Sequence, residues 1–201
     1  ALSKVSEIIF VDGGSADQSL KIARNLGTVI VSPKGRAIQM NTGATIASSE
    51  QLLFLHADTW INPLDLMRAS ERIIQEKLIA GCFTLQFTGS GISLHIIEFL
   101  GNLRARLTKV IYGDQGLLIR KKDFTKLGGF PAVSMMEDVL FSANLKKQGR
   151  ITVFPEKIHV SSRRFEKKGP FTTVFYYSFL YLLFLLKLPL PWIKKIYGDI
   201  R

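Results

Sequence analysis

The sequence contains a single cysteine, Cys82, among its 201 residues. A disulfide framework within the chain is therefore impossible, and nothing in the sequence requires an oxidising compartment. Cys82 lies in the apolar run from Leu78 to Phe83, where a small buried hydrophobic side chain is its expected role. Acidic residues are also few, since 16 Asp and Glu stand against 27 Lys and Arg and leave a net charge of +11. This balance favours anionic partners, such as phosphates, nucleic acid or an acidic membrane surface, without selecting one of them.

Long apolar runs are missing too. The longest, Phe171 to Leu186, is shorter than the roughly 20 residues that a membrane-spanning helix needs, and Lys187 and Pro189 close it. It predicts either an interfacial helix or a helix packed on the protein, and both readings stay open. The sequence has no signal peptide at its start and no helix-turn-helix, RNP-like or zinc pattern, so we expect no nucleic-acid partner. We expect a cytoplasmic protein, with a peripheral place on the inner face of the plasma membrane as the second reading.

Strands and helices alternate in the first half of the chain. Strands are predicted at Glu7 to Val11, Thr28 to Val31 and Gln51 to Leu55, each followed by a helical pattern. Ser15 is predicted to cap the first helix, and Asn62 with Pro63 to open the third. This order predicts an α/β fold with a mostly parallel sheet and helices on both faces.

The second half is less regular. It predicts a strand over 80–88, a helix from Ile92 to Val110, a strand from Gly116 to Arg120, a helix from Glu137 to Gln148, and two short strands at Ile151 to Phe154 and Lys157 to Val160. After Ser161 the composition becomes basic and then aromatic. We therefore divide the chain into a main domain, residues 1–165, and a basic and aromatic C-terminal helical appendage, residues 166–201.

Acidic turns follow two of the predicted strands. Asp12 comes after the first, and His56-Ala57-Asp58 after the third. Ligands of open parallel sheets bind beyond the carboxyl ends of the strands, so these carboxylates are candidates to hold a ribose and a Mg²⁺ or Mn²⁺ ion. The structural alternatives are a turn or cap for Asp12, an ordinary loop for Asp58, and a loop histidine for His56.

Three further groups are candidates. Glu137 and Asp138 open a helix, where acids favour its positive end, and one of them is a candidate base. The Lys34-Gly35-Arg36 turn is either a phosphate cradle or a solvated basic turn. Arg163 and Arg164 are either a clamp for a diphosphate or part of a membrane-facing basic patch.

In this order the motifs resemble the family 2 glycosyltransferases, and more closely a bacterial subgroup of small, single-domain members. The motifs that carry the resemblance are Val11-Asp12-Gly13-Gly14-Ser15-Ala16-Asp17, Gly35-Arg36-Ala37-Ile38-Gln39-Met40-Asn41-Thr42-Gly43-Ala44, Leu53-Phe54-Leu55-His56-Ala57-Asp58-Thr59, Tyr112-Gly113-Asp114-Gln115-Gly116, Leu127-Gly128-Gly129-Phe130-Pro131, Met136-Glu137-Asp138 and Ser162-Arg163-Arg164-Phe165. Each is weak alone, and together they span residues 7 to about 165.

The resemblance implies a GT-A fold and an inverting, metal-assisted transfer of a sugar, with UDP-hexose as the expected donor. The acceptor hydroxyl is left open among a lipid, a glycan, a small metabolite and a protein. The implied roles are donor binding for Asp12, Gly14, Ser15, Lys34, Arg36, Asn41, His56 and Asp58; metal binding for Asp58; catalysis for Asp138 with Glu137; the acceptor side for Gln115 and Gly116; and the diphosphate for Arg163 and Arg164.

The sequence departs from the family pattern in two places. His56 stands at the first position of the DxD motif, so Asp58 is the acid left to hold a metal. The strand and helix with which family members begin are also missing from the sequence, and they form a wall of the uridine pocket. The alternative function is therefore a non-catalytic module of the same fold that binds a nucleotide or a membrane.

Overall fold

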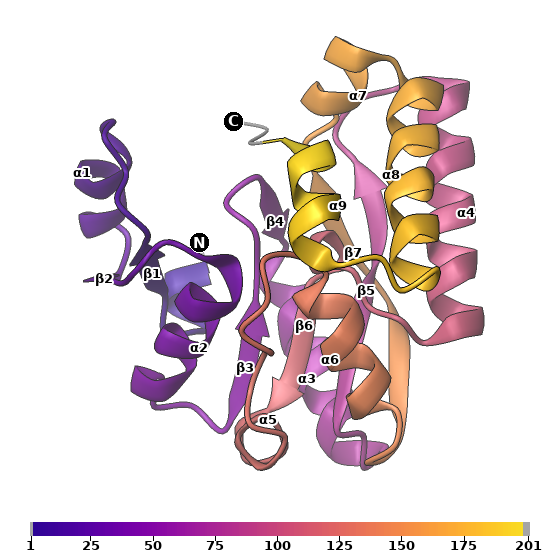
Figure 1. Ribbon diagram of the computed structural model, residues 1–201. Helices are drawn as coiled ribbons and strands as arrows, with labels where there is room; N and C mark the ends of the chain where they lie inside the picture. The colour runs from indigo at the N-terminus through magenta and orange to yellow at the C-terminus, as the bar shows by residue number, and fades with distance from the viewer. Residues whose placement is uncertain (1, 199–201) are drawn as a thin grey trace.

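The structure, a computed structural model, describes residues 2–198, with the side chains of Arg164 and Lys168 left aside (Figure 1). Its strands are β1 (Ile9–Asp12), β2 (Thr28–Val31), β3 (Gln51–Phe54), β4 (Thr59–Ile61), β5 (Ala80–Phe87), β6 (Leu117–Arg120) and β7 (Ile151–Val160). Its helices are η1 (Leu2–Lys4), α1 (Ser19–Arg24), α2 (Arg36–Ile46), α3 (Pro63–Gln75), α4 (Ile92–Thr108), η2 (Gly113–Gln115), α5 (Lys121–Lys126), α6 (Glu137–Leu145), α7 (Arg163–Lys168), α8 (Pro170–Leu185) and α9 (Leu190–Tyr197).

The strands form two sheets. β1 and β2 make a parallel pair, and the other five strands are ordered β3-β6-β5-β7-β4. β3, β5 and β7 run in one direction, but β6 lies reversed between β3 and β5, and β4 runs antiparallel to β7. The prediction of an α/β fold is confirmed, whereas the prediction of mostly parallel pairing is wrong. One reversed strand inside the sheet converts two neighbouring pairs to antiparallel at once.

The core lies on both faces of the five-stranded sheet, as β6 shows. Successive side chains of a strand point to opposite faces. Leu117 and Ile119 accordingly join a buried cluster with α2, α5 and α6, while Leu118 joins a second cluster with α3. The expectation of helices on both faces is therefore confirmed.

β7 is one strand where two short strands were predicted. It pairs with β5 throughout, and the register shifts so that Phe83 lies opposite Phe154 while the next residue, Thr84, lies opposite Lys157. Pro155 and Glu156 fall in the shift. Proline has no N–H to give to the ladder, so a bulge is one of the few places where a strand accepts it.

The two predicted helix caps differ in outcome. Asn62 caps α3 by accepting a hydrogen bond from Leu64 N at 2.9 Å, with Pro63 at the first helical position, as predicted. The cap predicted for Ser15 is wrong, because α1 begins only at Ser19. The backbone N–H of Ser15 instead donates to the Asp12 carboxylate.

The chain ends in three helices, α7 to α9. α8 packs side by side with α4 and α9 (Figure 1). The boundary predicted after residue 165 falls inside α7. None of the helices formed by residues 2–198 is both long and apolar enough to cross a membrane.

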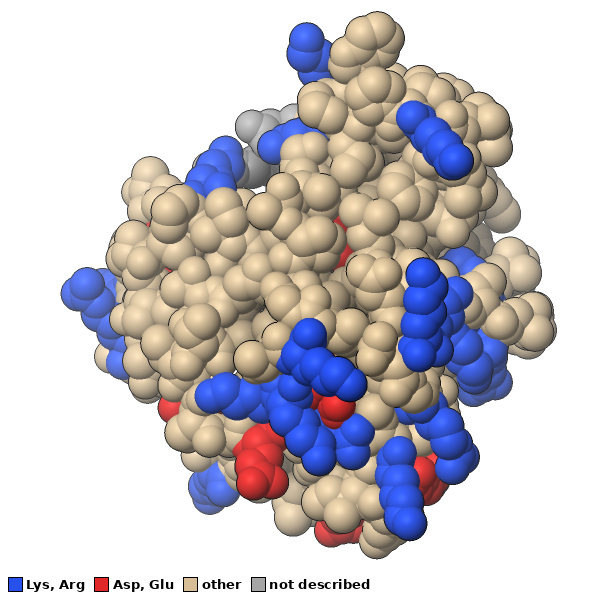
Figure 2. Space-filling view, turned by 60° about the horizontal axis from the view of Figure 1, so that its bottom comes forward, with Lys and Arg blue, Asp and Glu red and all other residues tan. Residues whose placement is uncertain are grey.

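Lys and Arg side chains gather at the end of the molecule that Figure 2 brings forward. Three of the basic side chains bond backbone carbonyls at helix C-termini: Lys146 donates to Thr108 O of α4 at 3.0 Å, Arg150 to Glu76 O after α3 at 3.3 Å, and Lys121 to Ala47 O after α2. Cations there satisfy carbonyls without a helical partner and favour the negative end of the helix. Part of the positive charge thus has a structural role at helix ends.

Candidate active site

Two adjacent acids open α6. Met136, the residue before them, adopts a left-handed conformation with φ of 62°. A non-glycine residue in this region is strained, and such strain persists only where the surroundings hold it in place. The tight entry sets Glu137 and Asp138 directly at the helix N-terminus. Their side chains have very different surroundings, because Glu137 is 1% exposed and Asp138 is 18% exposed.

Backbone N–H groups hold the Asp138 carboxylate from two sides. Gly113 N donates to Oδ2 and Val139 N to Oδ1, both at 2.8 Å. Gly113 comes from the segment before β6, so this contact joins α6 to η2. Ser142 reinforces the junction, since its hydroxyl donates to Asp138 O at 2.8 Å and accepts from Ile111 N at 3.0 Å. The carboxylate is therefore fixed in orientation and still reaches the surface.

Arg36 connects α2 to these acids. Its Nε lies 2.9 Å from Glu137 Oε1, and its NH2 lies 4.0 Å from Asp138 Oδ2 and 3.3 Å from His56 Nε2. The structure thus brings together four residues predicted to be functional from three distant segments of the chain. The Arg36 guanidinium is itself half exposed and faces both the acids and the solvent.

Glu137 is a buried acid with an incomplete set of hydrogen bonds. Burial raises its pKa, and the nearby Arg36 charge opposes that rise. The 2.9 Å approach of Arg36 is an ion pair without hydrogen-bond geometry, so Glu137 Oε1 makes no hydrogen bond within the described part of the chain. The stability of the buried Glu137 carboxylate therefore depends strongly on its half-exposed partner, Arg36.

Asp114 is a third acid of the site, and the residue-by-residue reading missed it. Asp114 is half-buried, and its Oδ1 is shielded from solvent and makes no hydrogen bond to any described residue. Burial, together with the charge of Asp138, raises its pKa to about 6. The available signal was its place in the Gly113-Asp114-Gln115-Gly116 motif, from which only Gln115 and Gly116 were selected.

The predicted acceptor-side residues form the wall beside Asp114. Gln115 is 1% exposed, and its Oε1 accepts a hydrogen bond from Arg104 NH2 at 2.9 Å. Arg104 also lies over the Tyr112 ring, 3.5 Å from its centroid. Gly116 has φ of 64°, which favours glycine, and a Cβ there would stand 2.9 Å from Ile158. Arg104 and Tyr112 were not predicted, since their contacts exist only in the folded chain.

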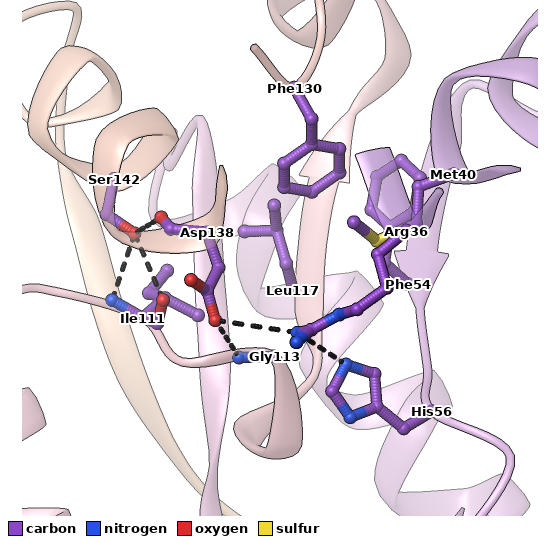
Figure 3. Close-up of a pocket in the computed structure, with 10 residues that line it drawn as sticks. All are labelled: Arg36, Met40, Phe54, His56, Ile111, Gly113, Leu117, Phe130, Asp138 and Ser142. Carbon is purple, nitrogen blue, oxygen red and sulfur yellow. Dashed lines mark hydrogen bonds and ion pairs between the residues drawn. The ribbon is translucent and has the colours of Figure 1, made fainter. Parts of the chain in front are cut away.

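A hollow opens between α2, α6 and β6 (Figure 3). Figure 3 shows the Asp138 side chain facing those of Arg36 and His56, with Phe130, Phe54 and Met40 nearby. The complete lining is Arg36, Met40, Phe54, His56, Ile111, Gly113, Leu117, Phe130, Asp138 and Ser142. An apolar hollow edged by a carboxylate, a guanidinium and an imidazole has the mixed character of small-ligand sites.

The turn after β1 is built around the Asp12 carboxylate. Gly14 N donates to it at 2.8 Å and Ser15 N at 3.0 Å, and these hydrogen bonds, those of Ser15 first, lower the pKa of Asp12. Gly14 has φ of 97°. The structural alternative for Asp12, a turn-forming residue, is therefore present in the fold. Ser32 N donates to Asp12 O at 2.9 Å, which brings the ends of β1 and β2 together ahead of Lys34 and the head of α2.

Asn41 was predicted to bind the donor, and the structure engages its amide elsewhere. Its Nδ2 donates to Phe130 O at 2.8 Å, and its Oδ1 accepts from Phe130 N at 2.9 Å. A Cβ on Gly129 would stand 2.7 Å from that same oxygen. Asn41 thus ties the glycine turn before Phe130 to α2.

Asp58 lies near the end of β7, two residues after His56. Its backbone oxygen accepts from Ser161 N at 3.2 Å, and α7 begins two residues later with the exposed Arg163. Pairing of β4 with β7 thereby brings Asp58 close in space to the segment that carries Arg163. The side chain of Arg164 lies outside the described residues.

Asp58 is the residue of this region that the sequence predicts to bind a metal ion. No cluster of three or more His, Cys, Asp or Glu side chains occurs within residues 2–198. The Asp58 carboxylate is exposed and makes no hydrogen bond or ion pair with another described residue. Mg²⁺ is often held by one or two carboxylates together with substrate phosphates, and Asp58 fits that mode. It does not fit a cage built by the protein alone.

Comparison with known proteins identifies the class to which this fold and site belong. The sequence matches the family described as glycosyl transferase family 2 over residues 2–132. The chain therefore belongs to glycosyl transferase family 2, and the predicted family is confirmed. No curated protein matches the chain.

Solved structures show the same fold. S. aureus TarS, residues 1–349, in complex with UDP is 21% identical with a TM-score of 0.60, over 77% of this chain and 51% of that one. The mannosyltransferase PcManGT from Pyrobaculum calidifontis, in complex with GDP-Man and Mn²⁺, is 19% identical with a TM-score of 0.60, over 76% and 47%. The chain thus spans about half the length of these proteins. The GT-A fold predicted from the sequence is confirmed.

Proposed function

We propose that this glycosyltransferase moves a hexose from a UDP-sugar to an acceptor hydroxyl with inversion, and that Asp138 is the base. The observation that carries the proposal is the Asp138 carboxylate, which two backbone N–H groups fix at the edge of the hollow while 18% of it stays exposed. A base must be oriented and reachable, and Asp138 is both. Glu137 is buried and ion-paired, which suits it to hold Arg36 in position rather than to take a proton.

The reaction that this geometry supports is a single displacement. The acceptor oxygen attacks the anomeric carbon, the new C–O bond forms, and the bond from that carbon to the diphosphate oxygen breaks. The acceptor proton passes to an oxygen of Asp138, and the electron pair leaves with the nucleoside diphosphate. General-base assistance of this kind contributes about 10²–10⁴ in rate.

The leaving diphosphate carries negative charge that the protein must balance. Arg36 is half exposed beside the hollow, and Arg163 begins α7 close to Asp58, so both guanidiniums are candidates to bind it. Asp58 is the residue that would hold Mg²⁺ or Mn²⁺; such an ion, when bound, neutralises charge on phosphate oxygens. The complexes of the neighbouring structures with UDP and with GDP-Man and Mn²⁺ support a nucleotide-sugar donor.

Calorimetric titration of UDP and UDP-sugars, with and without Mn²⁺, tests the donor assignment. We expect binding that Mn²⁺ strengthens and that Asp58→Asn weakens, while Asp65→Asn on α3 leaves it unchanged. Absence of nucleotide binding under all conditions would contradict the transferase assignment and favour the non-catalytic module. If nucleotide binding is unchanged both by Mn²⁺ and by Asp58→Asn, the transferase assignment stands and the metal assignment is wrong.

A further inference from the structure

Helices α4 and α8 expose apolar side chains along one stripe each. On α4 these are Ile92, Phe99 and Leu107, which are 81%, 65% and 74% exposed. On α8 they are Phe171, Phe175 and Leu182, which are 67%, 76% and 51% exposed. The spacings of seven, eight and four residues place each set on one side of its helix. Because α4 and α8 pack together, the stripes belong to neighbouring helices (Figure 1).

These stripes on two neighbouring helices are called here the α4–α8 face. Single exposed hydrophobic residues are normal, whereas contiguous apolar area marks an interaction site. The buried side of α8 is already satisfied, since Leu180 is 1% exposed and Thr173 is 4% exposed. Within residues 2–198, the outward Phe and Leu residues therefore remain exposed after α8 has packed on the rest of the fold.

The charges around the α4–α8 face are mainly positive, with Glu166 on α7 as an exposed acid. From Lys167 to Gly198 the sequence has five lysines and no acidic residue. Lys187, Lys194 and Lys195 are exposed at the end of α8 and on α9, and Trp192 on α9 is 65% exposed. On α4 the acid Glu98 is 14% exposed and its carboxylate accepts from the Phe87 backbone N–H, so it is turned to the sheet.

We infer that the α4–α8 face binds the surface of an anionic lipid bilayer. Apolar side chains with a basic border and an interfacial tryptophan match the acyl boundary and the negative headgroups of such a membrane. A second copy of the chain fits less well, because pairing of identical faces would bring two sets of lysines together. The face also adjoins the candidate site: Tyr181 of α8 lies 6.3 Å, centroid to centroid, from Tyr112, the residue before Gly113.

Co-sedimentation with vesicles tests this inference. The full chain is mixed with phosphatidylcholine vesicles and with vesicles that also contain phosphatidylglycerol. We expect the unaltered chain to bind the anionic vesicles. The affinity of the double variant Phe99→Ser/Phe175→Ser for these vesicles should be lower by roughly tenfold or more. In the double variant Lys194→Gln/Lys195→Gln, the loss of each lysine should lower the affinity for the anionic vesicles about fivefold. The matched control is Leu64→Ser/Ile74→Ser, which removes two exposed apolar side chains of α3, 60% and 70% exposed, and should change binding less than twofold.

Other results would overturn the inference. The membrane assignment is wrong if the full chain binds neither vesicle, or if Phe99→Ser/Phe175→Ser binds as well as the unaltered chain. It is also wrong if sedimentation velocity shows a dimer that this double variant makes monomeric, because a second copy would then cover the face. Circular dichroism verifies that each variant is folded. UDP binding is measured on the same samples. Because vesicle binding does not depend on the proposed sugar transfer, failure of the membrane assignment can then be distinguished from failure of the transferase assignment.

Discussion

Arg36 Nε, at the head of α2, lies 2.9 Å from Oε1 of Glu137, which is 1% exposed at the head of α6. The two residues are 101 positions apart in the sequence, and Arg36 also lines the hollow beside Asp138. The Arg36 charge offsets part of the free energy that desolvation of the buried Glu137 costs. Their contact also ties the geometry of the proposed base to the position of α2.

The Arg36–Glu137 pair should show clear energetic coupling. In a double-mutant cycle of Arg36→Ala and Glu137→Gln, we expect a coupling free energy of about 1 kcal/mol or more, since Arg36→Ala leaves an uncompensated buried carboxylate. Urea unfolding measures it. The pair Arg68 and Asp65, 3.6 Å apart on α3 with side chains 66% and 25% exposed, is the control and should couple by less than about 0.5 kcal/mol. Equal coupling in the two cycles would show that Glu137 does not depend on Arg36.

Asp114 should make stability depend on pH. Its pKa is raised from 3.8 to about 6, so the folded state holds the proton more tightly than the unfolded state. Between these values the folded state binds more protons, and stability therefore falls as pH rises from about 4 through 6. Relative to the unaltered chain, Asp114→Asn should gain thermal stability at pH 7.5 and lose that gain at pH 4. Glu71→Gln, at an exposed acid of α3, should show no such trend. A gain that is equal at both pH values would contradict the raised pKa.

The two glycines before Phe130 should respond differently to alanine. Both have positive φ, 78° for Gly128 and 74° for Gly129, so each substitution carries a similar conformational penalty. Only at Gly129 does a Cβ meet another group, Asn41 Oδ1 at 2.7 Å. Gly129→Ala should therefore destabilise the protein by about 1–3 kcal/mol more than Gly128→Ala, as measured by urea unfolding. If the two losses are equal, the Asn41–Phe130 contact is looser than described.

Gly113 should be required for the arrangement of the site rather than for the fold. A Cβ there would lie 2.5 Å from His56 Nε2 and 3.1 Å from Arg36 NH2, so both side chains would have to move. We expect Gly113→Ala to reduce turnover tenfold or more with a loss of stability below about 1.5 kcal/mol, because the clash falls on side-chain ends. Gly101→Ala on α4, where a Cβ meets nothing within 4 Å, is the control. Full activity of Gly113→Ala would contradict a role of His56 and Arg36 in the reaction.

Local signals in the sequence predicted most elements well. Asn62-Pro63 opens α3 as expected, and the β-branched run from Thr28 to Val31 forms a strand, because propensity and capping act over a few residues. The reversal of β6 between β3 and β5 could not be predicted in the same way. Its direction depends on the path of the chain through α4, and the pattern of apolar residues in a strand is the same in either direction.

The candidate site was predictable in its motifs and not in its contacts. Glu137, Asp138, Arg36 and His56 were all selected from short motifs, and they do meet in space. Asp114 was overlooked because an acid in a glycine-containing turn looks solvated, whereas the fold shields its Oδ1 from solvent and raises its pKa. Asn41 was assigned to the donor, and only the fold shows its pairing with a backbone 89 residues away.

The most direct test of the account is turnover of Asp138→Asn. UDP release from UDP-glucose and UDP-N-acetylglucosamine is followed with small sugar alcohols or water as the hydroxyl, and UDP affinity is measured on the same protein. We predict that turnover falls by about 10²–10⁴ while UDP affinity and the midpoint of unfolding stay close to those of Asp65→Asn. Turnover of Asp138→Asn within twofold of the unaltered enzyme would contradict the assignment of Asp138 as the base.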